Sequence, residues 1–170
     1  MERALPQATL RPLLPADTPM LAANFRASIE ELTGEDYSEA QQAAWMAVAD
    51  DEAAFGRRFG AGLALIAAIE GSPVGFISMK GADHIDMLYV HPAVAHEGIG
   101  SQLTDAVEKL AAARGVKRLT VDASDTARPL FEKRGYIAQH RNTISLGDEW
   151  LGNTRLEKDL SSPQASEKTA

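Results

Sequence analysis

Residues 84–103, HIDMLYVHPAVAHEGIGSQL, join a short apolar run to a helical pattern through a turn that contains two glycines. The apolar run covers residues 85–90, and Pro92 ends it because proline cannot donate to a strand ladder. After Gly98-Ile99-Gly100, apolar residues recur at helical spacing, and Gly115 follows as a helix terminator. The pattern predicts a strand, a loop and an amphipathic helix. The first N–H groups of such a helix lack intrahelical partners and attract anions.

The spacing Leu88-x-Val90-x-Pro92, followed after five residues by Gly98-Ile99-Gly100, resembles the pyrophosphate-binding motif of the GNAT superfamily of N-acetyltransferases. That family binds acetyl-coenzyme A (acetyl-CoA), which the resemblance implies as the co-substrate. Members usually carry Gln or Arg three residues before the first glycine, where this chain has Ala95. Backbone donors at the two glycines remain. The residues that the resemblance assigns to coenzyme A are Leu88, Tyr89, Val90, His96, Glu97, Gly98, Ile99, Gly100, Ser101, Ser124 and Phe131.

The composition narrows the class of protein. With 170 residues, 45% of them apolar, the chain has the size and composition of one soluble globular domain. No stretch is long and apolar enough to span a bilayer, and the N-terminus lacks an apolar signal core, so we expect a cytoplasmic protein without membrane contact. The absence of cysteine excludes disulfides, a metal site with cysteine ligands and a cysteine nucleophile. A formal net charge of −7 argues against nucleic-acid binding and is compatible with a cationic substrate.

Turn and periodicity signals divide the rest of the chain into further elements. A helix is expected from Asp17 or Thr18 to Leu32, with either residue as its cap, and another behind the capping-box spacing at 38–41. Residues 50–62 indicate only a helical turn and a loop. A short helix is expected before Gly135, capped by Ser124 and starting late because of Pro129. The other expected strands lie at 8–13, 63–69, 74–79, 117–121, 136–146 and 149–158.

The resulting order is strand, two helices, three antiparallel strands, helix, strand, helix and two strands. Strands 85–90 and 117–121 would be parallel, because a helix is the usual crossover between parallel neighbours. The order predicts an α+β domain with a central mixed, mostly antiparallel sheet flanked by helices, which is also the order of elements in the GNAT fold. The resemblance implies two splayed parallel strands that hold coenzyme A. We assign residues 1–160 to this single domain and expect residues 161–170 to be a disordered polar tail.

Two groups on the strand at 84–90 are candidates for the base that deprotonates an attacking amine. Ile85 and Leu88 are three positions apart, and this odd spacing on one apolar face predicts a bulge near Asp86-Met87. A bulge would free the backbone of Leu88 and Val90 for the pantetheine arm and the thioester oxygen. Family members often carry a carboxylate on this strand, which suggests Asp86, whose alternative role is a structural hydrogen bond. His84 titrates near neutral pH, and its alternative is an ordinary surface position.

The proton donor for the leaving thiolate is harder to assign. The family pattern A-x-x-x-Y-x-x-x-G reads from Ala127 to Gly135 here, with Phe131 in place of the tyrosine. A phenyl ring donates no proton, so water or Tyr89 would have to supply it. Ser124 stands where an asparagine that contacts coenzyme A is common, and its hydroxyl can still donate a hydrogen bond.

The resemblance places acceptor selection on the first two helices and the final hairpin. The polar and aromatic candidates there are Glu30, Glu31, Tyr37, Trp45, His140, Asn142 and Trp150. The histidines do not show the spacing of metal ligands, so we assign no metal site. An open sheet edge at the final hairpin is compatible with a homodimer.

The function that we expect is transfer of the acetyl group of acetyl-CoA to a primary amine of a small molecule or peptide. A noncatalytic acyl-CoA-binding regulatory module is the alternative, motivated by Phe131 and Ala95. A cavity blocked by Trp45 or Trp150 would favour that alternative, whereas an open cavity beside Asp86 would favour the enzyme. A partner-binding domain without a cofactor fits the composition but leaves Gly98-Ile99-Gly100 unexplained.

Overall fold

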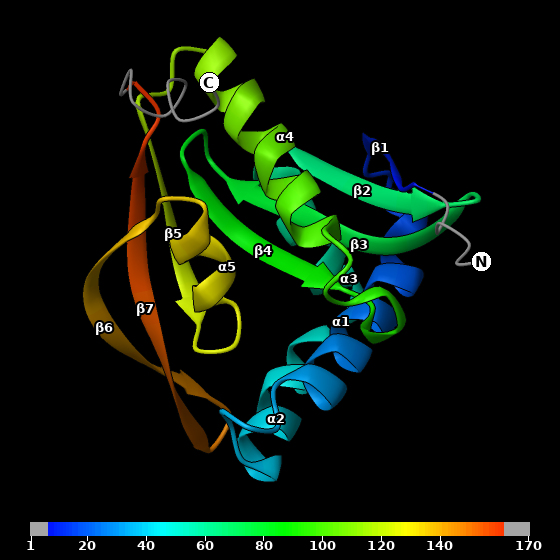
Figure 1. Ribbon diagram of the computed structural model, residues 1–170. Coiled ribbons are helices and arrows are strands. Elements are labelled where there is room, and N and C mark those ends of the chain that lie inside the picture. The colour runs from blue at the N-terminus through cyan, green and yellow to red at the C-terminus, as the bar shows by residue number, and fades with distance from the viewer. Residues whose placement is uncertain (1–6, 162–170) are drawn as a thin grey trace, which may run out of the picture.

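The computed structural model describes residues 7–161 and places one seven-stranded sheet at the centre (Figure 1). The strands are β1 (Thr9–Pro12), β2 (Ala64–Ile69), β3 (Ser72–Lys80), β4 (His84–Val90), β5 (Arg118–Ser124), β6 (Ile137–Leu146) and β7 (Glu149–Asp159). The α-helices are α1 (Thr18–Leu32), α2 (Glu39–Met46), α3 (Glu52–Arg58), α4 (Ile99–Ala113) and α5 (Arg128–Lys133). The tail expected at 161–170 lies outside the described residues, apart from Ser161.

The sheet order is β1-β2-β3-β4-β5-β7-β6, and β4–β5 is its parallel pair. These two strands pair only at His84 with Thr120 and at Ile85 with Val121. Figure 1 shows them diverging beyond this point, toward their C-terminal ends. The mixed, mostly antiparallel sheet with two splayed parallel strands confirms the predicted α+β fold class. The splay therefore separates the first four strands of the sheet, β1–β4, from the last three, β5–β7.

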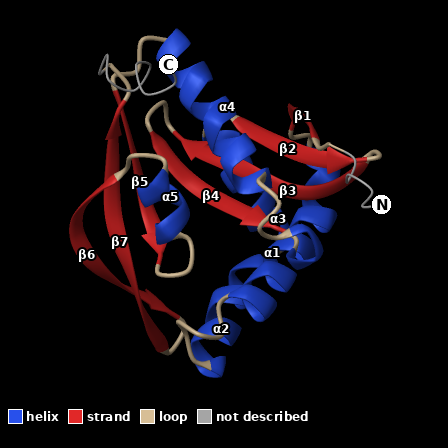
Figure 2. Ribbon diagram, viewed as in Figure 1, coloured by secondary structure: helices blue, strands red, loops and turns tan. Residues whose placement is uncertain are grey.

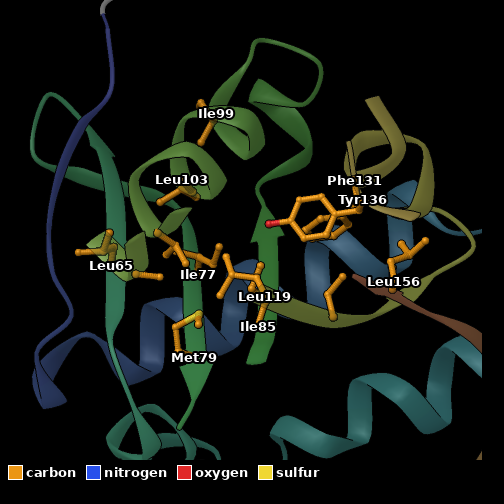
Figure 3. Close-up of a cluster of buried hydrophobic side chains, with 14 of the residues drawn as sticks. Leu65, Ile77, Met79, Ile85, Ile99, Leu103, Leu119, Phe131, Tyr136 and Leu156 are labelled. Atoms are coloured by element: carbon orange, nitrogen blue, oxygen red, sulfur yellow. The ribbon is translucent and has the colours of Figure 1, made fainter. Parts of the chain in front are cut away.

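Helices cover both faces of the sheet (Figure 2). On one face, Leu103 and Val107 of α4 are fully buried against a cluster that includes Ile77 and Leu119. Phe131 of α5 and Tyr136 extend this cluster across the splay, with ring centroids 5.1 Å apart (Figure 3). On the other face, the buried side chains come from α1, α3, the 3-10 turn that follows α3, and the sheet. They are led by Phe25, Ile29, Phe55, Phe59, Ile66 and Phe76.

A buried carboxylate ties α4 to the C-terminal half of the sheet. Glu108 is 7% exposed, and its Oε1 accepts hydrogen bonds from Arg134 Nη2 at 2.7 Å and Lys158 Nζ at 3.0 Å. The Tyr136 hydroxyl donates to Oε2 at 2.9 Å. Burial, together with the charge of Glu108, raises the pKa of Tyr136. The cluster fixes the orientation of α4, and with it the position of the glycine turn at the start of that helix.

Several local predictions are confirmed by hydrogen bonds. Ser38 and Gln41 form the predicted capping box, with Gln41 N–H donating to Ser38 Oγ and Ser38 N–H donating to Gln41 Oε1. The hairpin between β6 and β7 turns at the predicted Gly147. The helix α5 starts late, at Arg128, so that Pro129 falls in its first turn, where no N–H is needed.

Other local predictions were wrong. Residues 50–62 contain the two-turn helix α3, since Asp51 caps it at Ala54 N–H and Phe55 and Phe59 are buried one helical turn apart. The expected capping carboxylate of Asp17 instead binds Arg11 and the N–H of Leu14.

The strand expected to end at Val121 continues to Ser124 because it pairs with β7 along its whole length. Ser124 is therefore part of β5, and Ala127 occupies the cap position of α5. Among residues 7–161, no helix has the length and apolar character needed to cross a membrane.

Candidate active site between the splayed strands

A β-bulge at Asp86 shapes β4 where it separates from β5. Ser78 of β3 pairs with Met87 whereas Met79 pairs with Ile85, so Asp86 is the extra residue. The bulge near Asp86-Met87 was predicted and is confirmed. Beyond Ile85, the edge of β4 that faces β5 has no strand partner, so its backbone is available to an extended ligand. This edge includes the predicted coenzyme A contacts Leu88, Tyr89 and Val90.

A cavity of about 320 Å³ lies between the diverging strands. Both strands line it, together with α1, α2, α3, α5 and the β6–β7 hairpin. Trp150 does not block it, because that side chain is 65% exposed and is not part of the lining. Trp45 forms part of one wall and leaves the cavity open. Lining side chains from outside the two strands are Phe25, Tyr37, Trp45, Val48, Arg58, Ala127, Phe131, Ile144, Leu146, Leu151 and Asn153.

Tyr37 holds the two sides of the cavity together. Its hydroxyl donates to the carbonyl of Gly152 at 2.7 Å and accepts from the N–H of Asp125 at 2.9 Å. Gln41 of α2 donates from Nε2 to the carbonyl of Trp150 at 2.7 Å. Figure 1 shows the end of the β6–β7 hairpin beside α2. The hairpin is thus fastened across the splay as the far wall of the cavity.

Asp86, a predicted base, is paired with Arg58 at the edge of the cavity. Arg58 Nε lies 3.2 Å from Oδ2 of Asp86, and Nη2 lies 3.1 Å from each carboxylate oxygen. The Asp86 side chain is 17% exposed. Both of its oxygens are therefore occupied by one guanidinium.

His84, the other predicted base, lies in the cavity lining between two residues of β5. Its Nδ1 is 2.7 Å from Thr120 Oγ1, and its Nε2 is 3.8 Å from Asp122 Oδ2. Burial lowers the pKa of His84 below its ordinary value of about 6.5, against the opposing charge of Asp122. The imidazole is neutral at pH 7 and can accept a proton.

The Thr120 hydroxyl is the hydrogen-bond partner of that imidazole. Thr120 Oγ1 lies 2.7 Å from Nδ1 of His84 and 3.5 Å from the carbonyl oxygen of Asp83, so it can accept from an N–H at Nδ1 or donate to a lone pair there. Nε2 of His84 faces Asp122, a carboxylate that would stabilise the imidazolium.

Asp122 is itself held by side chains from the final hairpin. Arg155 Nε and Nη2 lie 2.7 and 2.9 Å from its two oxygens, and Asn142 Nδ2 donates to Oδ1 at 3.0 Å. The hydrogen bonds from Arg155 lower the pKa of Asp122. Asn142, an expected acceptor-binding residue, is thus a partner of Asp122.

Tyr89 and Phe131 occupy different parts of the lining. The Tyr89 hydroxyl accepts a hydrogen bond from Trp45 Nε1 at 3.1 Å, and burial raises the pKa of Tyr89 to about 12. Phe131 is 1% exposed and packs edge-on against Tyr136. Ser124 Oγ accepts from the N–H of Ala127 at 3.1 Å, so its hydroxyl hydrogen remains available as a donor.

The glycine turn before α4 is exposed, whereas Ile99 and Gly100, the first residues of the helix, are buried. His96, Glu97 and Gly98 are exposed, and Gly98 has φ +86°, a conformation that favours glycine. The first hydrogen bond of α4 runs from Gln102 N–H to the carbonyl of Gly98 at 2.9 Å. The N–H groups of Ile99, Gly100 and Ser101 precede it and have no intrahelical acceptor.

Gly100 also permits close packing between two helices. A Cβ at this position would lie 2.8 Å from Leu130 Cδ1 of α5. The first turn of α4 therefore packs directly on α5, at the open end of the splay.

The structure brings together only some of the acceptor-side candidates. Tyr37 and Trp45 line the cavity, whereas Glu30, Glu31 and His140 are exposed and lie outside the lining. Arg58, Asp122 and Phe25 also line the cavity and were not predicted as site residues. The Asp51 cap and the Phe55–Phe59 spacing could have predicted the helix α3, which carries Arg58. Among residues 7–161, no three His, Cys, Asp or Glu side chains are grouped to hold a metal ion.

Comparisons with known proteins agree with this arrangement. Residues 33–151 match the family model described as "Acetyltransferase (GNAT) domain". The chain is 31% identical over 144 residues to the "Uncharacterized N-acetyltransferase YafP" of Escherichia coli K12, covering 85% of this chain and 91% of that protein.

Solved structures share the fold. A crystal structure from Rhodopseudomonas palustris, described as "GCN5-Related N-acetyltransferase: Aminotransferase, Class-II", has 55% identity and a TM-score of 0.88 over 94% of this chain and 99% of that one. PaiA N-acetyltransferase from Thermoplasma acidophilum, in complex with coenzyme A, has 20% identity and a TM-score of 0.74 over 89% and 98% of the two chains. The family match and the sequence relatives together show that this chain belongs to the GNAT family of N-acetyltransferases.

Proposed function

We propose that this chain binds acetyl-CoA between β4 and β5 and transfers the acetyl group to a primary amine of a small molecule or peptide. One observation carries the proposal. The two parallel strands separate after two paired positions, and a cavity lined by both lies in the splay, beside a bulge that exposes the backbone of β4. Such an opening can hold an extended thioester arm on one side and an amine on the other.

The donor would bind along the open edge of β4 and the start of α4. The pantetheine arm would pair with the backbone of Leu88 and Val90, as an added strand does. The pyrophosphate would meet the N–H groups of Gly98, Ile99, Gly100 and Ser101 at the positive end of the helix, and His96 and Glu97 would flank it. The T. acidophilum structure, which has the same fold, is a complex with coenzyme A, and this supports coenzyme A as the ligand.

His84 is the base in our proposal. It lines the cavity, and Asp122 lies 3.8 Å from its Nε2 to stabilise the imidazolium. In this role Nδ1–H would donate to Thr120, and Nε2 would accept the proton of the amine. Asp86 is the alternative base, and it would first have to release Arg58 from both of its oxygens. We therefore assign Asp86 and Arg58 to positioning, with Arg58 fixing the bulged backbone through Asp86.

The transfer step then follows directly. The ammonium loses a proton to His84, and the amine nitrogen attacks the thioester carbonyl carbon. The nitrogen of the tetrahedral intermediate then loses its second proton to water as the C–S bond breaks. The product is an amide and the thiolate of coenzyme A. The thiolate leaves without a general acid from the protein and is protonated by the solvent, because a thiolate is a tolerable leaving group near neutral pH. Burial raises the pKa of Tyr89 to about 12, so its phenol is a poor proton donor to that thiolate. Tyr89 is accordingly a wall of the site in this proposal.

The alternative function is a noncatalytic acyl-CoA-binding regulatory module. Phe131, buried and unable to donate a proton, is the observation that favours it. The open cavity beside His84 and Asp86 supports the enzyme instead.

Calorimetric titration of the purified chain with acetyl-CoA, followed by thiol release across a panel of amines, tests the proposal. Saturable binding with amine-dependent thiol release is the expected result. Binding without release from any amine would move the assignment to the regulatory module. Absence of binding would overturn the role of the glycine turn.

A further inference from the structure

A row of aromatic rings forms one wall of the cavity. The ring centroids of Tyr37 and Trp45 are 5.3 Å apart, those of Trp45 and Tyr89 are 6.3 Å apart, and those of Tyr89 and Phe25 are 4.6 Å apart. All four residues belong to the lining. They come from α1, α2, the segment between these helices, and β4.

The polar atoms of this wall are mostly used within the protein. The Tyr37 hydroxyl donates to one backbone group and accepts from another, and the Trp45 N–H donates to Tyr89. In the described structure, the Tyr89 O–H is the one donor of these four side chains without an acceptor. The wall therefore offers a ligand aromatic surface and few hydrogen bonds.

A second wall comes from the final hairpin and is mostly aliphatic. Ile144, Leu146 and Leu151 line the cavity from β6 and β7, and Asn153 of β7 is the polar side chain that the hairpin adds to the lining. A group placed between this wall and the aromatic row would be enclosed by apolar side chains on both sides. Binding of a polar group there would cost its hydration without replacing its hydrogen bonds.

The two carboxylates of the lining are already neutralised. Asp86 is paired with Arg58, and Asp122 is paired with Arg155. Among the described lining residues, Asp86 and Asp122 are the only acidic ones. A second ammonium group, as in a diamine, would therefore find no unpaired carboxylate among the described lining residues.

We infer that the acceptor is an amine with a single positive charge, carried on an aromatic or branched aliphatic group that lies between the two apolar walls. This inference rests on the proposed acetyl transfer and specifies its substrate class. The cavity of about 320 Å³ also holds the thioester end, so the group is of the size of one ring or one branched chain.

Direct binding of amines tests this class independently of turnover. The chain has two tryptophans, so Trp150→Phe leaves Trp45 as the only fluorescent indole and places the reporter in the cavity wall. With coenzyme A present, phenethylamine is compared with ethylamine, and pentylamine is compared with its diamine, cadaverine. We expect phenethylamine to bind at least about 10-fold more tightly than ethylamine, and pentylamine more tightly than cadaverine.

Two isoleucines of β6 provide a matched pair of variants. Ile144 lines the cavity and is 38% exposed, whereas Ile137 is 68% exposed and lies outside the lining. Ile144→Asn should reduce the preference for phenethylamine over ethylamine by about 10-fold, and Ile137→Asn should leave it unchanged.

The outcomes separate this inference from the proposed function. Tighter binding of the apolar monoamines without thiol release supports the acceptor class and overturns the catalytic proposal. Thiol release that is as fast or faster with cadaverine than with pentylamine, or with ethylamine than with phenethylamine, supports catalysis and overturns the acceptor class. Absence of binding by every amine, or equal effects of the two isoleucine variants, also overturns the inference.

Discussion

The guanidinium of Arg58 binds both carboxylate oxygens of Asp86, with Nη2 3.1 Å from each of them. Asp86 is the extra residue of the β4 bulge, so this pair fixes the strand at the point where it leaves β5. His84, two residues earlier on the same strand, has a different environment, in which Nε2 faces a carboxylate across the cavity. The two candidate bases of β4 therefore have distinguishable roles.

Asp86→Asn should lower kcat by less than about tenfold, because the amide keeps the shape of the side chain and His84 still accepts the proton. Loss of a general base would instead cost about 10²-fold or more. Thiol release at saturating acetyl-CoA and amine measures the difference. A loss of the larger size would transfer the role of base to Asp86.

The activity should depend on pH through His84. Burial lowers its pKa below about 6.5, so kcat/KM should be constant with respect to this group above that pH and decrease as pH falls through the lowered value. His84→Gln should remove this acid limb and lower kcat by about 10² to 10⁴-fold. An unchanged acid limb in the variant would show that another group titrates.

The lowered pKa of His84 also makes the stability of the fold depend on pH. The unfolded chain protonates His84 at a higher pH than the folded chain does, so the contribution of this group is present above about 6.5 and is lost as pH falls below that value. Denaturant unfolding of the wild type and of His84→Gln at several pH values measures it. A wild-type stability that rises relative to the variant on acidification would contradict the burial of a neutral imidazole.

Tyr89→Phe should retain kcat within about tenfold, since a phenol with a pKa raised to about 12 is a poor donor to a thiolate. The variant loses only the hydrogen bond from Trp45. Single-turnover thiol release is the appropriate measurement. A loss of about 10²-fold in the rate of thiol release would identify Tyr89 as the general acid, in place of the tyrosine that Phe131 replaces.

Two glycines at opposite ends of α4 test the anion site. Gly98 has φ +86° and Gly115 has φ +84°, and a Cβ at either position would meet open space. Alanine at either position should cost about 1 kcal/mol of stability through backbone strain. Only Gly98→Ala should weaken acetyl-CoA binding, by about tenfold, as expected for a displaced hydrogen bond to a charged group. Equal affinities of the two variants in calorimetry would contradict phosphate binding at this turn.

Glu108→Gln should destabilise the fold by about 3–5 kcal/mol, because Lys158 would remain partly buried without this carboxylate and Arg134 would keep only the more exposed Asp105. Asp105→Asn is the matched control on the same helix. Its side chain is 44% exposed and shares Arg134, and its loss should cost about 1 kcal/mol or less. Chemical denaturation compares the two variants, and similar midpoints would show that Glu108 does not hold α4 in place.

Much of the fold could be predicted because its signals are local. The capping box at Ser38, the turn at Gly147 and the periodicity from Ile99 onward each specify structure within a few residues. The helix α3 was underestimated because it is short, and its apolar face consists of Phe55 and Phe59 with little further pattern.

The site could be predicted only in part, for a related reason. The bulge and the glycine turn are properties of one segment. The pairs Arg58–Asp86 and Asp122–Arg155 join residues that are far apart in the chain, so no sequence spacing predicts them. Their effect is to neutralise both acids of the cavity, which only the folded arrangement reveals.

Mass analysis of the amine after incubation with the chain and acetyl-CoA shows directly whether the acetyl group is transferred to the amine nitrogen. With phenethylamine as acceptor, we expect the amine nitrogen to gain one acetyl group for every molecule of coenzyme A released. Release of coenzyme A without acetylated amine, or no release at all under conditions where acetyl-CoA binds, would contradict the account.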